Sequence, residues 1–154
     1  MATDFDEVKQ TEIAAQALKV KIQVVEVKDR SEFQSAYNAM RRENAHALIL
    51  IQGSFTTFHR KELIELGTKN RLPTMCEGVR WTEDGCLISY GPDSNYQWQR
   101  AAVFVDKILK GRKPADLPVE QPVKFELVFN LNTAKQIGLT IPPNVLVRAD
   151  RVIQ

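Results

Sequence analysis

Segments with strand-like and helix-like patterns alternate along this chain, and no other feature of the sequence constrains the fold as strongly. Residues 47–51 form a continuous apolar run, which is typical of a parallel strand covered on both faces. Short connections between alternating strands and helices predict right-handed crossovers and a three-layer α/β fold, with a parallel sheet between helices. The expected strands are 21–27, 47–51, 72–76, 86–90 and 124–130, and the expected helices are 5–19, 31–40, 58–70, 93–111, 132–138 and 142–149, with a polar loop over 79–84.

The size and composition of the chain predict one globular domain over residues 1–154. Its 154 residues suffice to bury a substantial core, and a net charge of +2 gives no reason to expect a nucleic-acid partner. No apolar run approaches the roughly 20 residues of a membrane-spanning helix. The N-terminal residues are polar and acidic, so the sequence as written carries no export signal and predicts a cytoplasmic location.

The cysteines and histidines do not form a metal or catalytic signature. Cys76 and Cys86 lie ten residues apart, and His46 and His59 are distant from them in the sequence. Two interpretations of the cysteines stay open, a disulfide across the intervening loop or two unpaired thiols packed near strand ends. No nucleophile–base pair and no glycine-rich phosphate fingerprint is found. We therefore expect no enzyme activity, catalytic residue, metal or cofactor.

Candidate ligand contacts lie in the loops after Ile51, Cys76 and Tyr90, because open parallel sheets bind ligands at the carboxyl ends of their strands. These loops combine aromatic and polar side chains, which suits a small organic ligand. Asp93 can cap the next helix, face a ligand, or do both. Trp81 can pack on the domain or offer a flat surface to a ligand.

Helix 93–111 has an apolar face that we expect to be buried. Asp93 or Ser94 can cap its start, and Gly111 lies where a left-handed C-cap belongs. Residues 112–122 contain three prolines and predict an extended crossing segment. The apolar face consists of Trp98, Ala101, Ala102, Val105, Ile108 and Leu109.

Several motifs of the second half of the chain resemble one known family. They include Tyr90-Gly91-Pro92, Val-Asp-Lys-Ile-Leu-Lys-Gly over 105–111, Lys-Pro-Ala-Asp-Leu-Pro-Val-Glu-Gln-Pro over 113–122 and Lys-Phe-Glu-Leu-Val over 124–128. This half closely resembles the C-terminal half of ABC-transporter substrate-binding proteins of the tryptophan/tyrosine type. The similarity extends upstream over nearly the whole chain.

The resemblance implies a Rossmann-like lobe of a type I periplasmic binding protein. In that fold two α/β lobes, joined by three crossing strands, close on a ligand between them. This chain resembles the second lobe, and the first lobe is absent. Residues 93–111 are then the inter-lobe helix and 112–122 a crossing segment. That helix would pack on the missing first lobe. In the chain alone, its apolar face would fold back onto its own sheet or be buried by a second copy, and we expect a dimer, with exchange of this helix as one route.

The same resemblance implies a solute-binding component of an uptake transporter. Its partners would be a small organic solute, such as an amino acid, and a membrane permease, and its location would be periplasmic or at the cell surface. Ser54, Trp81, Tyr90 and Asp93 would then line the cleft, with Asp93 bound to a ligand amino group. The alternative is a non-enzymatic, flavodoxin-like signalling or assembly domain with no ligand of its own.

Overall fold

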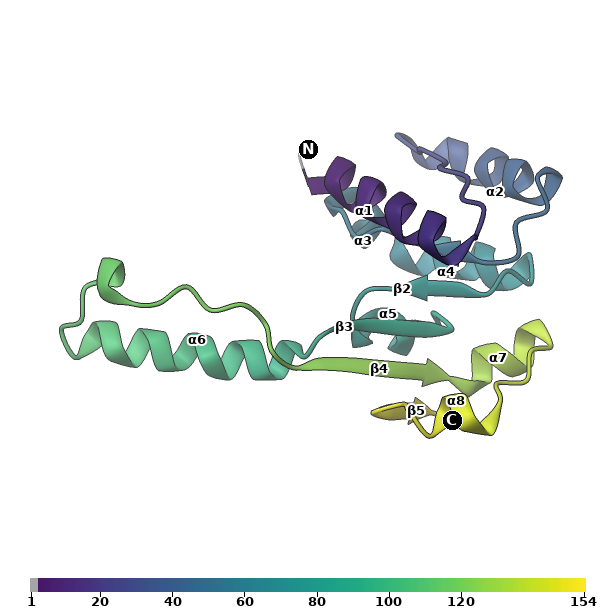
Figure 1. The fold of residues 1–154 in the computed structure, drawn as a ribbon. Helices are drawn as coiled ribbons and strands as arrows, with labels where there is room; N and C mark the ends of the chain where they lie inside the picture. The colour runs from purple at the N-terminus through teal and green to yellow at the C-terminus, as the bar shows by residue number, and fades with distance from the viewer. Residues whose placement is uncertain (1–2) are drawn as a thin grey trace.

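The computed structural model describes residues 3–154, with side chains from Asp6 onward, and its centre is a five-stranded sheet of order β1-β2-β3-β4-β5. The helices before β3 lie on the β1 side of the sheet or against its faces, and α7 and α8 lie beside β4 and β5 (Figure 1). The strands are β1 (Leu48–Ile49), β2 (Thr74–Cys76), β3 (Ile88–Pro92), β4 (Phe125–Asn130) and β5 (Arg151–Ile153).

The expected all-parallel sheet is corrected in one place, at β4. β1, β2 and β3 are parallel to one another, but β4 pairs antiparallel with β3, and β5 is parallel to β4. The chain leaves the sheet at the end of β3 and returns at the same end, so the returning strand must run in the opposite direction. β5 was not expected, because Arg151–Ile153 is too short to show a strand pattern.

The helices differ from the expected ones mainly between β1 and β3. The expected helix 58–70 is present as a helix over Arg60–Lys69, the expected loop after Ile51 contains a further short helix over Ser54–Phe58, and the expected polar loop 79–84 contains another. The helices are α1 (Thr3–Leu18), α2 (Phe33–Arg42), α3 (Ser54–Phe58), α4 (Arg60–Lys69), α5 (Val79–Glu83), α6 (Ser94–Leu109), α7 (Leu131–Ile137) and α8 (Pro143–Leu146), and short 3-10 turns cover Arg30–Glu32 and Pro114–Asp116. The Phe5 side chain, which was expected on the apolar face of the first helix, lies outside the described side chains.

The expected strand 21–27 is wrong, and the expected central strand 47–51 is a short edge strand. In the described chain, residues 20–29 form no strand, although Val27 packs against the cluster of Phe33, Tyr37, Leu63 and Leu72. A strand pattern yields a strand only where a neighbour supplies backbone partners. Among residues 3–154, β1 pairs only with β2, and its Ile49 is 53% exposed.

The core connects the strands to α2, α4 and α5. The buried Tyr37 hydroxyl of α2 donates a 2.6 Å hydrogen bond to the Leu63 carbonyl of α4, and burial raises the Tyr37 pKa. A second cluster joins Ile64 and Trp81 to a disulfide between Cys76 and Cys86. The structure thus contains the disulfide, one of the two interpretations left open by the sequence. The third cluster packs α7 on β3 and β4 and comprises Leu87, Phe129, Ala134, Ile137 and Ile141.

Helix α6 and residues 110–124 form an arm that extends away from the sheet (Figure 1). Residues 110–124, the return segment, run back along α6 to β4. The left-handed conformation of Gly111, with a φ of 94°, confirms the expected C-cap. The expected burial of the apolar helix face is wrong for this chain, because none of the 16 residues of α6, all of them described, is buried.

Within residues 3–154, no helix combines the length and apolar character needed to cross a membrane.

We predict that the Cys76–Cys86 disulfide contributes about 2 to 3 kcal/mol to the free energy of unfolding, the loop-entropy value for a sequence separation of 10. Urea titrations with and without dithiothreitol measure this difference. The reduced protein should unfold at a lower urea concentration. Two free thiols in the untreated, denatured protein, or equal unfolding midpoints, would contradict the prediction.

Candidate functional site

The candidate site lies where β3 leaves the sheet and β4 returns to it. Tyr90 belongs to β3, Asp93 follows β3 and caps α6, and both contact the first residues of the β4 side. The structure therefore brings two of the four predicted site residues to one place. Ser54 lies apart from them in the fold, at the first position of α3 beyond β1, and is exposed.

Trp81 is a core residue rather than an exposed platform in this chain. Its side chain is 4% exposed and packs in the cluster with Ile64 and the disulfide. Of the two interpretations of Trp81, the structure agrees with packing on the domain. Its contribution to a binding site would be indirect, because α5 contacts both β3 and β4 and so supports the site from behind.

The Asp93 carboxylate is nearly enclosed and has three hydrogen-bond donors. Its Oδ1 accepts from the backbone N–H groups of Asn95 at 2.9 Å and Tyr96 at 3.1 Å, which confirms the expected N-cap. Its Oδ2 lies 2.7 Å from the Nζ of Lys124. The hydrogen bond from Lys124 and those from the backbone lower the pKa of Asp93. The hydrogen bond between Lys124 and Asp93 also raises the pKa of Lys124.

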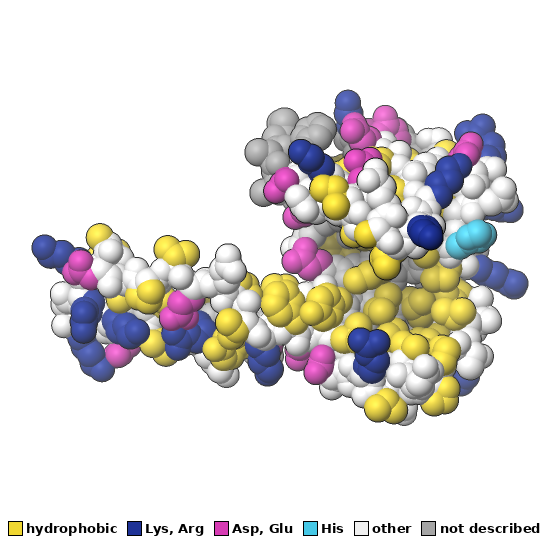
Figure 2. All heavy atoms as spheres, in the orientation of Figure 1, with side chains coloured by type: hydrophobic (Ala, Val, Ile, Leu, Met, Phe, Trp, Pro, Cys, Tyr) yellow, Lys and Arg dark blue, Asp and Glu magenta, His cyan; other side chains and the backbone are white. Residues whose placement is uncertain are grey.

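Tyr90 and Phe125 form the apolar part of the site. Their rings stack with centroids 5.6 Å apart and an interplanar angle of 19°, and both side chains are exposed. They lie on adjacent antiparallel strands, where Pro92 is the direct partner of Phe125 and Tyr90 that of Leu127. The end of the β3–β4 ladder thus carries an exposed aromatic pair and, one residue beyond Pro92, the Asp93 carboxylate. Apolar side chains gather at the base of the arm and on the adjoining face of the domain (Figure 2).

The loop after β2 lies directly against β3 at this site. A Cβ atom on Gly91 would be 2.9 Å from the Gly78 nitrogen and 3.1 Å from the Glu77 side chain, so only glycine fits at position 91 without a shift. Gly78 itself has a φ of 81°. This close approach places the exposed Glu77 next to Gly91 of β3.

Sequence reasoning missed Lys124 and Phe125 as site residues. Both belong to the strand predicted over 124–130, but the sequence does not show that this strand pairs with β3 in the antiparallel direction. One feature of the sequence does point to them. The strand predicted over 124–130 directly follows the proline-containing segment 112–122, so it returns to the sheet near the place where the chain left it.

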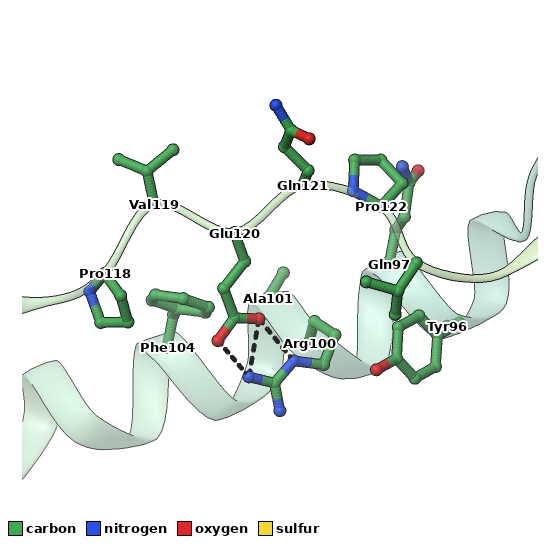
Figure 3. Close-up of a pocket in the computed structure, with 11 residues that line it drawn as sticks. Tyr96, Gln97, Arg100, Ala101, Phe104, Pro118, Val119, Glu120, Gln121 and Pro122 are labelled. Atoms are coloured by element: carbon green, nitrogen blue, oxygen red, sulfur yellow. Dashed lines mark hydrogen bonds and ion pairs between the residues drawn. The ribbon is translucent and has the colours of Figure 1, made fainter.

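A second concave region lies on the arm, between α6 and the return segment (Figure 3). Arg100 bridges its two sides, with Nε and Nη2 donating to Glu120 Oε2 at 2.9 and 2.7 Å, and its guanidinium also lies near the Phe104 ring. Val119 on the rim is fully exposed. An open apolar surface of this kind suits a protein partner better than a small solute, because it does not enclose its contents.

Comparison with known proteins gives one family and several similar structures. A family model described as ABC transporter substrate binding protein matches residues 2–153. A conserved domain protein from Vibrio cholerae is 24% identical with a TM-score of 0.85, and the match covers 98% of this chain and 51% of that one. An ABC domain from Streptococcus pneumonia in complex with L-Trp is 23% identical with a TM-score of 0.84, over 97% of this chain and 50% of that one.

A third structure is the ligand-free, open form of a substrate binding protein with adhesive properties from Clostridium difficile. It is 16% identical with a TM-score of 0.75, and the match covers all of this chain and 51% of that one. The search among curated proteins finds no match. The three likenesses confirm the α/β fold, and this chain spans about half the length of each of these structures.

We predict that the Asp93–Lys124 pair makes the stability of the protein pH-dependent in acid. The pKa of Asp93 is lowered on folding, so its contribution to stability is complete above its ordinary value of 3.8 and is lost as the pH falls through the folded pKa. The pKa of Lys124 is raised, so the contribution of Lys124 is present below its ordinary value of 10.5 and is lost at higher pH.

Thermal unfolding of the wild type and Asp93→Asn, which keeps a capping oxygen, measures this dependence. The wild type should have the higher Tm at neutral pH, and the difference should narrow as the pH falls from about 5 to about 2. Asp106→Asn on the exposed arm, where Asp106 pairs with Lys110 at 2.9 Å, controls for the loss of one surface ion pair. A difference for Asp93→Asn that stays constant across this range would contradict the prediction.

Proposed function

This chain belongs to the ABC transporter substrate-binding protein family, and we propose that it forms one lobe of the solute-binding component of an ABC-type uptake transporter. The match of the family model to residues 2–153 carries this proposal. The half-length coverage of the similar structures supports the one-lobe interpretation. The membrane permease of such a transporter is the proposed partner, and the periplasm or cell surface is the proposed location.

The proposed solute carries an ammonium group and an apolar or aromatic part. Asp93 supplies a nearly enclosed carboxylate that already binds an ammonium, that of Lys124. Tyr90 supplies an exposed aromatic ring three residues before Asp93. An α-amino acid with a large side chain meets both requirements, and the Streptococcus structure with L-Trp supports this class of ligand. Ser54 lies apart from Asp93 and would contact only a part of the solute that extends toward α3, and Trp81 would support the site from the core.

The described site forms one wall, and the solute needs a second wall for high affinity. Tyr90 and Phe125 are exposed, so a solute on them would keep much of its own surface in water. A clamped ligand loses a large share of its contacts when one wall is absent. We therefore expect residues 1–154 alone to bind amino acids weakly, in the millimolar range.

Nuclear magnetic resonance titration of labelled residues 1–154 with L-tryptophan or L-leucine tests this function. The backbone N–H groups of Asn95 and Tyr96 donate to Asp93, so their resonances should shift as the solute binds. Asp93→Asn should weaken binding by about tenfold or more, because it removes a charge-assisted hydrogen bond. Asp106→Asn should bind as the wild type does. Equal affinity of the wild type and Asp93→Asn would contradict the proposed role of Asp93.

The exposed arm is the proposed surface for a second lobe or a second copy of the chain. Trp98 is 73% exposed, and Val105, Ile108 and Leu109 on the same helix are also exposed. Apolar helix faces of this size are normally covered in water-soluble assemblies. In the isolated chain a second copy is the available partner.

We predict that residues 1–154 form a dimer through the arm at micromolar concentration. Sedimentation velocity should show the dimer for the wild type and a monomer for Trp98→Glu, which places a charge on the apolar face. Phe58→Glu is the matched control, because Phe58 is also strongly exposed but lies on α3, outside the arm. A compact wild-type monomer, or an equal effect of the two substitutions, would count against the proposal.

A further inference from the structure

We propose that Lys124 occupies the position of the solute's ammonium group in the ligand-free protein and must leave Asp93 before an ammonium solute can bind. This inference rests on the proposed function and adds a residue that sets specificity. Lys124 then selects for cationic groups, because a neutral group cannot replace its charge on the carboxylate.

The geometry of Asp93 leaves a single position for an ammonium. Oδ1 is held by the two backbone N–H groups at the start of α6, and these cannot move without opening the helix end. Oδ2 is 2.7 Å from Lys124 Nζ, and the Asp93 side chain is only 5% exposed. Because Oδ1 is held by the helix end and Oδ2 by Lys124, a solute ammonium that binds Oδ2 takes the place where Lys124 now lies.

Lys124 is free to move while its backbone stays fixed. Its side chain is 60% exposed, and its flexible stem lets the ammonium move over several ångströms. Its carbonyl accepts a 2.9 Å hydrogen bond from the Asp93 N–H, which continues the pairing of β3 with β4. The exchange of ammonium groups therefore requires no change in the sheet.

Two other carboxylates are available to Lys124 after it leaves Asp93. Glu126 and Asp150 both act electrostatically on Lys124 in the present structure. Asp150 also accepts a 2.8 Å hydrogen bond from the Leu127 backbone, so it is held beside β4. Displaced Lys124 thus stays among negative charges, and Asp93 passes from one ammonium to another without being left buried and unpaired.

The Asp93–Lys124 contact should weaken the binding of solutes with an ammonium group and should not affect solutes without one. A solute with an ammonium competes with Lys124 for Oδ2, so the free energy of the Asp93–Lys124 contact opposes its binding. A solute without an ammonium leaves Lys124 in place and is indifferent to that contact. L-tryptophan and indole-3-propionate differ only in this group and form a matched pair of probes.

The test compares the wild type, Lys124→Met and Lys124→Arg, using the titration of residues 1–154 with each probe. Lys124→Met should tighten L-tryptophan binding by about tenfold, the value of one charge-assisted hydrogen bond, and leave indole-3-propionate unchanged. Lys124→Arg keeps the cation and should not tighten either probe. Weaker or unchanged L-tryptophan binding by Lys124→Met would overturn the inference, because Lys124 would then contact the solute or play no part.

A second readout separates failure of the inference from failure of the proposed function. Ethylammonium chloride, a minimal ammonium, should shift the Asp93 carboxyl carbon resonance in Lys124→Met at concentrations that leave the wild type unchanged. Tetramethylammonium chloride, which has no N–H donor, should shift neither. If no amino acid binds but ethylammonium behaves as expected, the inference stands and the amino-acid function fails. If ethylammonium has no effect on Lys124→Met, the inference fails.

Discussion

The antiparallel pairing of β3 with β4 is the contact on which the rest of this structure depends. Five residue pairs, from Ile88 with Phe129 to Pro92 with Phe125, join the two halves of the sheet. The hydrogen bond from Asp93 N–H to the Lys124 carbonyl extends this pairing to the base of the arm. The same pairing brings the Tyr90 and Phe125 rings together, so it shapes both the arm and the candidate site.

The parts of the fold that depend on local chemistry could be predicted from the sequence. The Asp93 cap and the left-handed Gly111 follow from short-range hydrogen bonding and backbone geometry. Features that depend on a neighbour could not be predicted. Residues 21–27 have a strand pattern but no backbone partner in the described chain, and the α6 face has apolar residues but no surface to cover them.

In the candidate site too, some residues could be predicted from the sequence and others could not. Ligands bind at the carboxyl ends of parallel strands, and this rule predicted Tyr90 and Asp93, which both lie at the end of β3. Trp81 could not be assigned from the sequence, because an aromatic residue in a loop has the same local pattern whether it is exposed or packed on a disulfide. Lys124 is 31 positions from Asp93, and only the direction of β4 places its ammonium on that carboxylate.

A crystal structure of the chain with L-tryptophan bound would show whether Asp93 and Tyr90 form the solute-binding wall of this lobe. We expect the amino nitrogen of the solute within about 3 Å of Asp93 Oδ2, its ring against Tyr90, and Lys124 moved toward Glu126 and Asp150. A solute between α6 and the return segment, with Lys124 still on Asp93, would show that this wall does not bind the solute.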